Sequence, residues 1–308
     1  MEEIVLHEVG MRDGLQMEPQ AVPLETKIRW LDALMHSGID IIQVGSFVHP
    51  VKVPQMADTD RLFEHYRGTG RKPVGVTLSA LVLNERGLER AHACGVELLC
   101  MGVSASETHS RKNTGMSIAE ATDRILSMAR TGLDSGMKVQ VSVQSAFGCG
   151  FEGPVPAETV LRIAARFVEA GLVHISLADT AGHAVPEQVE SMFQEVMKLD
   201  PKVACACHLH DTFGLGLVNC LAARRVGVRC FETAVAGLGG CPFTKVAGGN
   251  VCTEDFVHYL QRTGQCVEVD LNGLIGVARD MAGFFGRELP GRVYKTGPIA
   301  YRADMRQL

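Results

Sequence analysis

The chain has 308 residues, of which 46% are hydrophobic and 21% are charged, so it is long enough to bury one large core. Its net charge is −5 and no run of Lys or Arg marks a binding stripe, which excludes nucleic acid as an expected partner. No apolar run is long enough for a membrane span. Ten scattered cysteines without a signal peptide predict reduced thiols in a cytoplasmic enzyme.

Strand-like and helix-like patterns alternate along the chain. Short apolar runs predict strands at residues 4–9, 39–44, 73–78, 96–103, 138–143, 173–177, 203–208 and 230–235. Helical patterns lie between them at 25–36, 85–93, 117–135, 156–170, 186–199 and 215–226, several of them ending at a glycine. Eight such units predict a TIM barrel, with an open doubly wound sheet as the alternative because periodicity cannot show closure.

The whole chain, residues 1–308, is predicted to form a single barrel domain. Residues 265–308 are expected to be a C-terminal extension, with a helix at 272–287 that packs across the barrel. In such a barrel, polar residues just after a strand point into the mouth of the active site. The strand ends therefore identify the candidate functional residues.

The predicted seventh strand ends in the motif HLHD, which begins at His208. Because side chains alternate along a strand, His208 and His210 lie on one face, and both imidazoles can reach one divalent ion. Two histidines with local hydrogen bonds are the alternative interpretation. The position at a strand end favours the metal site.

The predicted first strand leads into Arg12-Asp13-Gly14. Asp13 can supply a hard oxygen ligand and complete a set of two histidines and one carboxylate. Arg12 can present its cationic fork to an oxygen that becomes negative. Taken alone, this motif is also typical of a turn with a surface salt bridge.

Two further strand ends carry polar groups. A glycine-rich loop after the eighth strand holds Cys241, whose thiol could reach a substrate, although a lone loop cysteine is more often inert. The same loop ends at Asn250, whose carbonyl oxygen is a possible neutral metal ligand. The second strand contains Gln43, a polar residue that pure packing would not favour at an inward position.

The runs GMRDGLQ, SFVHPVKVPQMAD, SASETHSRKNT, HLHDTFGLGLVN and GLGGCPFTKVAGGN occur in this order between residues 9 and 255. Together they resemble the 3-hydroxy-3-methylglutaryl-CoA lyase family of metal-dependent TIM-barrel enzymes. The resemblance implies an acyl-CoA thioester substrate and a bound Mg²⁺ or Mn²⁺. The implied metal ligands are Asp13, His208, His210 and Asn250.

The resemblance also implies a retro-aldol-type cleavage. The metal would chelate the tertiary hydroxyl and a carboxylate of the substrate, and Asp13 or His208 would accept the hydroxyl proton. The bond then breaks to give the enolate of acetyl-CoA and a ketone or keto acid. Arg12 would stabilise the enolate oxygen, and Cys241 would protonate the enolate carbon.

Further positions follow from the same resemblance. Gln16, Ser46 and Thr180 would line the pocket, with Asp179 behind it, and Lys112 is a weak candidate for a CoA phosphate contact. A homodimer and a role in leucine breakdown would be ordinary for this family. The C-terminal tail lacks the cysteine that some members use between subunits, so we expect no thiol switch there.

Gln43 departs from the family pattern, which has a glutamate at this position. Glutamine keeps the shape and can hydrogen-bond, but it carries no charge and cannot act as a base. We therefore expect metal binding to survive the change. The preferred substrate is left open between 3-hydroxy-3-methylglutaryl-CoA and a related thioester, such as citramalyl-CoA or a longer glutaryl derivative. A Claisen-type synthase and a non-catalytic acyl-CoA-binding relative are the competing hypotheses.

Overall fold

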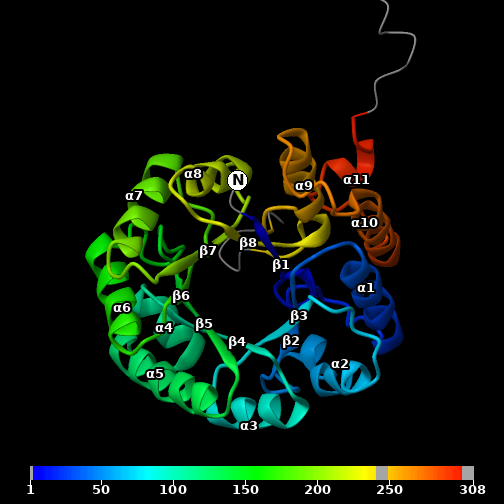
Figure 1. Ribbon diagram of the computed structural model, residues 1–308. Helices are drawn as coiled ribbons and strands as arrows, with labels where there is room; N and C mark the ends of the chain where they lie inside the picture. The colour runs from blue at the N-terminus through cyan, green and yellow to red at the C-terminus, as the bar shows by residue number, and fades with distance from the viewer. Residues whose placement is uncertain (1–2, 241–248, 300–308) are drawn as a thin grey trace, which may run out of the picture.

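Eight parallel strands form a closed barrel in the computed structural model, which describes residues 3–240 and 249–299. The strands follow one another around the barrel in chain order (Figure 1). They are β1 (Val5–Glu8), β2 (Ile41–Ser46), β3 (Thr77–Leu81), β4 (Leu98–Ser104), β5 (Lys138–Gln144), β6 (His174–Asp179), β7 (Ala204–Leu209) and β8 (Cys230–Thr233). Because β1 pairs with β8, with Val5 opposite Cys230, the TIM-barrel prediction is confirmed and the open sheet is wrong.

Helices surround the barrel on its outer face (Figure 1). They are α1 (Leu24–His36), α2 (Thr59–Tyr66), α3 (Glu85–Cys94), α5 (Ile118–Asp134), α6 (Ala157–Glu169), α7 (Pro186–Met197) and α8 (Gly216–Arg225). The short helix α4 (Glu107–Thr114), which follows β4, lies inside this ring (Figure 1). After the last strand come α9 (Thr253–Arg262), α10 (Leu271–Phe285) and α11 (Val293–Thr296). Of the described helices, none is long and apolar enough to cross a bilayer.

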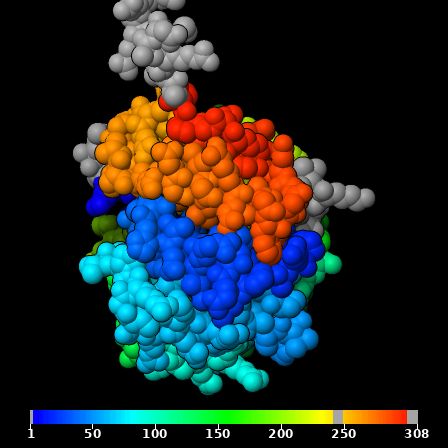
Figure 2. Space-filling view, turned by 90° about the vertical axis from the view of Figure 1, so that its right-hand side faces the viewer, coloured from blue at the N-terminus to red at the C-terminus, as the bar shows by residue number. Residues whose placement is uncertain are grey.

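The C-terminal helices pack against the first helix of the barrel. Trp30 of α1 meets Phe284 of α10 edge to face, with ring centroids 5.6 Å apart. The indole Nε1 of Trp30 also donates a 2.6 Å hydrogen bond to Asp280. Figure 2 shows the orange and red C-terminal segment lying directly on the blue N-terminal one. The expected helix at 272–287 is therefore present and packs on the outside of the barrel.

The third strand was predicted too early in the chain. The expected run at 73–78 is replaced by β3 at Thr77–Leu81, because Gly75 adopts a φ of +96° and turns the chain just before the strand. Val74 is fully exposed as a result. Residues 10–14, which contain the turn-like motif Arg12-Asp13-Gly14, form one π-helical turn, in which the amide of Asp13 donates to the carbonyl of Val9 over 2.7 Å.

Polar side chains occupy the inside of the barrel where branched apolar residues usually pack. Each strand contributes at least one, and the layer includes His7, Gln43, Ser79, Cys100, Gln140, Ser176, His208 and Glu232. They are buried or nearly so, and several bond to one another across the barrel, such as His7 Nε2 with Ser79 Oγ at 2.9 Å. Most buried polar groups in proteins are hydrogen-bonded, because an unpaired one costs free energy. This polar layer supports the site that lies at the carboxyl ends of the strands.

Candidate active site

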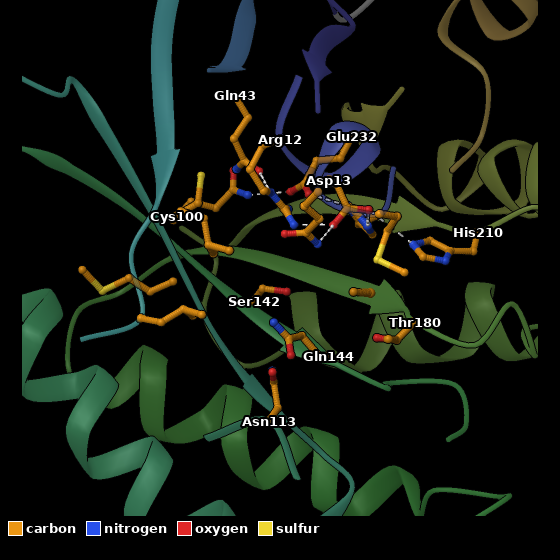
Figure 3. Close-up of a pocket in the computed structure, with 18 of the residues that line it drawn as sticks. Arg12, Asp13, Gln43, Cys100, Asn113, Ser142, Gln144, Thr180, His210 and Glu232 are labelled. Carbon is orange, nitrogen blue, oxygen red and sulfur yellow. Dashed lines mark hydrogen bonds and ion pairs between the residues drawn. The ribbon is translucent and has the colours of Figure 1, made fainter. Parts of the chain in front are cut away.

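A cavity of about 300 Å³ opens at the carboxyl ends of the strands. Its walls include residues from the turn after β1, from β2, β4, β5, β7 and β8, and from α4. Figure 3 shows Arg12, Asp13, Glu232 and His210 along one side of the cavity, with Gln144 and Asn113 on the other. Strand ends and loops at this face are where barrel enzymes place their chemistry.

Three potential metal ligands converge on this cavity. The Nε2 atoms of His208 and His210 lie 3.9 Å and 3.8 Å from Oδ2 of Asp13. All three donor atoms fall within 4.8 Å of one another, so this cluster can hold a metal ion. Burial would raise the pKa of Asp13, but Arg12 and the two histidines lower it well below its usual range. The carboxylate is therefore ionised and ready to bind a cation.

Asn250 joins the same cluster. It forms an isolated bridge with His210, and its Nδ2 donates to Asp13 Oδ2 over 2.8 Å and to the carbonyl of Leu238 over 3.1 Å. Its Oδ1 is buried and has no hydrogen-bond partner within the described residues. An unpartnered buried oxygen beside a carboxylate and two imidazoles fits a divalent cation.

The turn that carries Arg12 and Asp13 is tied to the end of β8. The buried carboxylate of Glu8 accepts from the amide of Gly10 over 2.6 Å and from the amide of Val235 over 3.0 Å. It also accepts from the hydroxyl of Thr253. Burial raises the pKa of Glu8 to about 7, which these hydrogen bonds oppose. Glu8 thus fixes the turn against the segment that leads into the glycine-rich loop.

Arg12 lies between two acceptors. It forms an ion pair with Asp13, and its Nε donates to Oε1 of Gln43. Gln16 adds a 3.2 Å hydrogen bond from Nε2 to Asp13 Oδ1. Gln43 therefore keeps Arg12 in place through a neutral hydrogen bond and leaves the positive charge of Arg12 opposed by Asp13.

The other residues predicted to form the pocket differ in whether they reach the cavity. Thr180 lines the cavity, and its Oγ1 accepts from the amide of Ser145 over 3.0 Å. Asp179 is buried at the end of β6 and accepts from the amides of His183 and Ala184. Ser46 does not line the cavity; its backbone amide donates to Thr59 Oγ1 and its carbonyl accepts from the same hydroxyl.

Two other predictions concern groups at the edge of the site. Cys241 lies outside the described residues, although Gly240 just before it lines the cavity. Lys112 of α4 has its Nζ 4.8 Å from the centre of the Phe151 ring. The nine cysteines within the described ranges are all free thiols.

Sequence reasoning missed a buried carboxylate behind His208. Glu232 of β8 has Oε2 at 2.8 Å from His208 Nδ1, and its Oε1 accepts from Gln140 Nε2 over 2.6 Å. Burial would raise the pKa of Glu232, but the hydrogen bond to His208 lowers it to about 2. The signal in the sequence is a glutamate inside the apolar run CFET, where packing gives no reason for one.

The HMGL-like family model matches residues 3–281, nearly the whole chain. The chain belongs to this family. The predicted resemblance is thereby confirmed, and the match covers every strand of the barrel and the described members of the metal cluster.

Individual relatives agree with the family match. The chain is 36% identical to hydroxymethylglutaryl-CoA lyase YngG of Bacillus subtilis, over 94% of this chain and 95% of that protein. It is 37% identical to (R)-citramalyl-CoA lyase of Chloroflexus aurantiacus, over 97% and 96% of the two chains. The structure of an HMG-CoA lyase from Acinetobacter baumannii, in complex with coenzyme A and 3-methylmalate, superposes with a TM-score of 0.90 at 34% identity, covering 97% of each chain.

The family places the chain among the lyases. These relatives are named as lyases and match nearly from end to end. The competing hypotheses of a Claisen-type synthase and of a non-catalytic relative find no such support. The protein is a carbon–carbon lyase of the HMGL-like family, and the cavity described above is its candidate active site.

Proposed function

We propose that the protein is a divalent-metal-dependent lyase that cleaves a 3-hydroxy-3-methylglutaryl-CoA-like thioester to acetyl-CoA and a keto acid, which is acetoacetate for that substrate. The observation that carries this proposal is the convergence of Asp13, His208 and His210 at one point beside Arg12. A metal cluster next to a fixed guanidinium suits a reaction that creates an alkoxide and then an enolate.

The donor set favours a hard cation. Asp13, the two histidines and the free Oδ1 of Asn250 would hold Mg²⁺ or Mn²⁺. When bound, the cation supplies Lewis acidity that lowers the pKa of a substrate hydroxyl. The chain contributes the geometry: Gln16 and Asn250 hold the Asp13 carboxylate from two sides, so its oxygens stay directed at the cluster.

Arg12, Asp13, His208 and Cys241 carry the proposed chemistry. Asp13 or His208 accepts the hydroxyl proton, and the Arg12 guanidinium stabilises the thioester oxygen as the enolate forms. Cys241 then gives a proton to the enolate carbon. The position of Gly240 in the cavity wall supports this role, because the next residue is Cys241.

A related substrate is the second candidate. Gln43 offers Arg12 a neutral acceptor, so it does not offset the positive charge of Arg12 as a glutamate would. Arg12 can therefore pair more strongly with a repositioned carboxylate of the substrate. The 37% identity to (R)-citramalyl-CoA lyase supports citramalyl-CoA as that alternative. Gln43, Gln16 and Thr180 are the proposed substrate contacts. Asp179, at the end of β6, and Ser46, at the end of β2, would contribute less directly.

The test is a comparison of kcat/KM for three thioesters: 3-hydroxy-3-methylglutaryl-CoA, citramalyl-CoA and a longer glutaryl homologue. Acetyl-CoA release from the first as the best substrate supports the main proposal. A preference for citramalyl-CoA moves the assignment to the second candidate. Release of free CoA from acetyl-CoA and a 2-oxo acid, without cleavage of any of the three, would contradict both.

The assembly, compartment and pathway of the protein are proposed from its resemblance to the family. We propose a single-domain homodimer that works in the cytoplasm, with leucine breakdown as the pathway served by the standard substrate. Gel filtration with light scattering tests the assembly. A monomer at micromolar concentration would contradict it.

A further inference from the structure

The two histidines of the metal cluster are held differently. His208 has its Nδ1 at 2.8 Å from the Glu232 carboxylate. His210 has a buried Nδ1 without any hydrogen-bond partner among the described residues. Both Nε2 atoms face Asp13 at nearly equal distances. The difference between the two rings therefore lies behind them, on the side away from the cluster.

Glu232 is held in its turn by the polar layer inside the barrel. It is 5% exposed, and its second oxygen accepts from Gln140 of β5, which reaches across the barrel from the opposite wall. Among the cavity-lining residues that the structure describes, Arg12 is the only Arg or Lys, and it is engaged by Asp13 and Gln43. The Glu232 carboxylate thus has His208 as its ionisable hydrogen-bond partner.

A carboxylate in this position determines which nitrogen of His208 carries the proton. An ionised carboxylate can only accept, so Nδ1 must donate to it, and the lone pair of the neutral ring is then on Nε2. Nε2 is the atom that points at Asp13. A carboxylate behind a ligating histidine also makes that ligand more basic.

We infer that Glu232 is a positioning residue that fixes the tautomer and direction of His208, and that Gln140 fixes Glu232. This inference rests on the proposed function, because it assigns His208 to the metal through Nε2. His210 lies just after β7, is held by its backbone bridge to Asn250, and has no such carboxylate at its Nδ1 among the described residues. The two histidines therefore contribute unequally: the tautomer of His208 is fixed before the cation binds, whereas that of His210 is not.

The test uses three variants. Glu232→Met removes the acceptor and keeps the length of the side chain. Glu232→Gln keeps one oxygen that can accept from Nδ1 and removes the charge. Ser79→Ala is the matched control, because Ser79 belongs to the same buried polar layer but bonds to His7 instead of Glu232.

Two readouts are independent of turnover. Mn²⁺ binding, measured by electron paramagnetic resonance without substrate, should weaken about 10–100-fold in Glu232→Met, less in Glu232→Gln, and less than about twofold in Ser79→Ala. Long-range ¹H–¹⁵N spectra of the metal-free protein at about pH 9, where an ordinary imidazole is neutral, should show His208 protonated at Nδ1. Glu232→Met should lose that tautomer preference.

The outcomes separate this inference from the function on which it rests. A parent protein that binds no Mn²⁺ would contradict the proposed metal site, while the tautomer spectra would still decide the role of Glu232. Unchanged Mn²⁺ affinity and tautomer in Glu232→Met, in a protein that does bind Mn²⁺, would overturn only the positioning role. Equal losses in Glu232→Met and Ser79→Ala would assign the effect to general damage and also overturn it.

Discussion

The two sides of the cavity differ in charge. Arg12, Asp13, His208 and Glu232 are grouped where β1, β7 and β8 meet. The opposite side, from α4, β5 and the end of β6, presents neutral amides and hydroxyls, namely Asn113, Ser142, Gln144 and Thr180 (Figure 3). Because bond breaking needs charge and acyl recognition needs shape, we infer that chemistry belongs to the charged side and selectivity to the neutral side.

The largest expected effect is on the charged side. His210→Ala removes one of three clustered donors, so Mn²⁺ affinity should fall more than about 100-fold and turnover should fall with it. Isothermal titration with Mn²⁺ measures the first and acetyl-CoA release the second. A variant that binds Mn²⁺ normally would remove His210 from the metal site.

Cys241→Ala should separate proton transfer from metal binding. Loss of a proton donor typically costs about 10²–10⁴-fold in rate, while the described metal ligands remain in place. Turnover and Mn²⁺ affinity should be measured on the same preparation. Cys149→Ala, at a buried thiol that does not line the cavity, is the control. Unimpaired turnover in Cys241→Ala would exclude the thiol as the proton donor.

Gln43→Glu tests whether the residue that contacts Arg12 determines substrate preference. A carboxylate there would pair with Arg12 through the contact that Gln43 now makes. We expect the ratio of kcat/KM for 3-hydroxy-3-methylglutaryl-CoA over citramalyl-CoA to rise by about tenfold, which corresponds to roughly 1.4 kcal/mol. An unchanged substrate ranking would show that Gln43 does not decide selectivity.

A smaller effect is expected on the neutral side. Gln144→Ala removes one amide from the cavity wall, and a neutral hydrogen bond contributes about 0.5–1.5 kcal/mol. KM should therefore rise a few-fold while kcat and Mn²⁺ affinity stay close to those of the parent protein. A drop in kcat without a change in KM would contradict the division between the two sides.

The last prediction concerns the stability of the fold behind the charged side, not catalysis. Burial raises the pKa of Glu254 to about 7, above its ordinary 4.5, and its Oε2 accepts from the amide of Ala236. A group whose pKa is raised on folding stabilises most below its unfolded pKa, so stability should decline as pH rises from about 4.5 to 7. Glu254→Gln should flatten this decline by about 1–3 kcal/mol. Melting temperatures at pH 5 and 8 measure it, and an unchanged slope would contradict it.

The sequence predicted the barrel because eight short, mostly apolar runs alternate with helical patterns, several of which end at a glycine. It also brought Asp13, His208 and His210 together correctly, since side chains at the carboxyl ends of barrel strands share one mouth. Their roles stay predictions. What could not be predicted depends on contacts across the barrel: the pairing of Glu232 with His208 and Gln140 joins residues 24 and 92 positions apart.

Local irregularities were missed for a different reason. The π-helical turn at residues 10–14 is stabilised by Glu8 and by the end of β8, so its local sequence shows only a turn. The start of β3 was misplaced because Val74 is apolar and β-branched, yet Gly75 directs the chain away from the sheet until Thr77. In both cases tertiary contacts or one dihedral angle outweighed the local pattern.

The most direct test of the whole account is acetyl-CoA release from 3-hydroxy-3-methylglutaryl-CoA by the purified protein, before and after removal of divalent metal with a chelator. We expect release that the chelator abolishes and that added Mg²⁺ or Mn²⁺ restores, because Asp13, His208 and His210 are arranged around one cation. Release that persists in the metal-free protein would contradict the assignment of this cluster to catalysis.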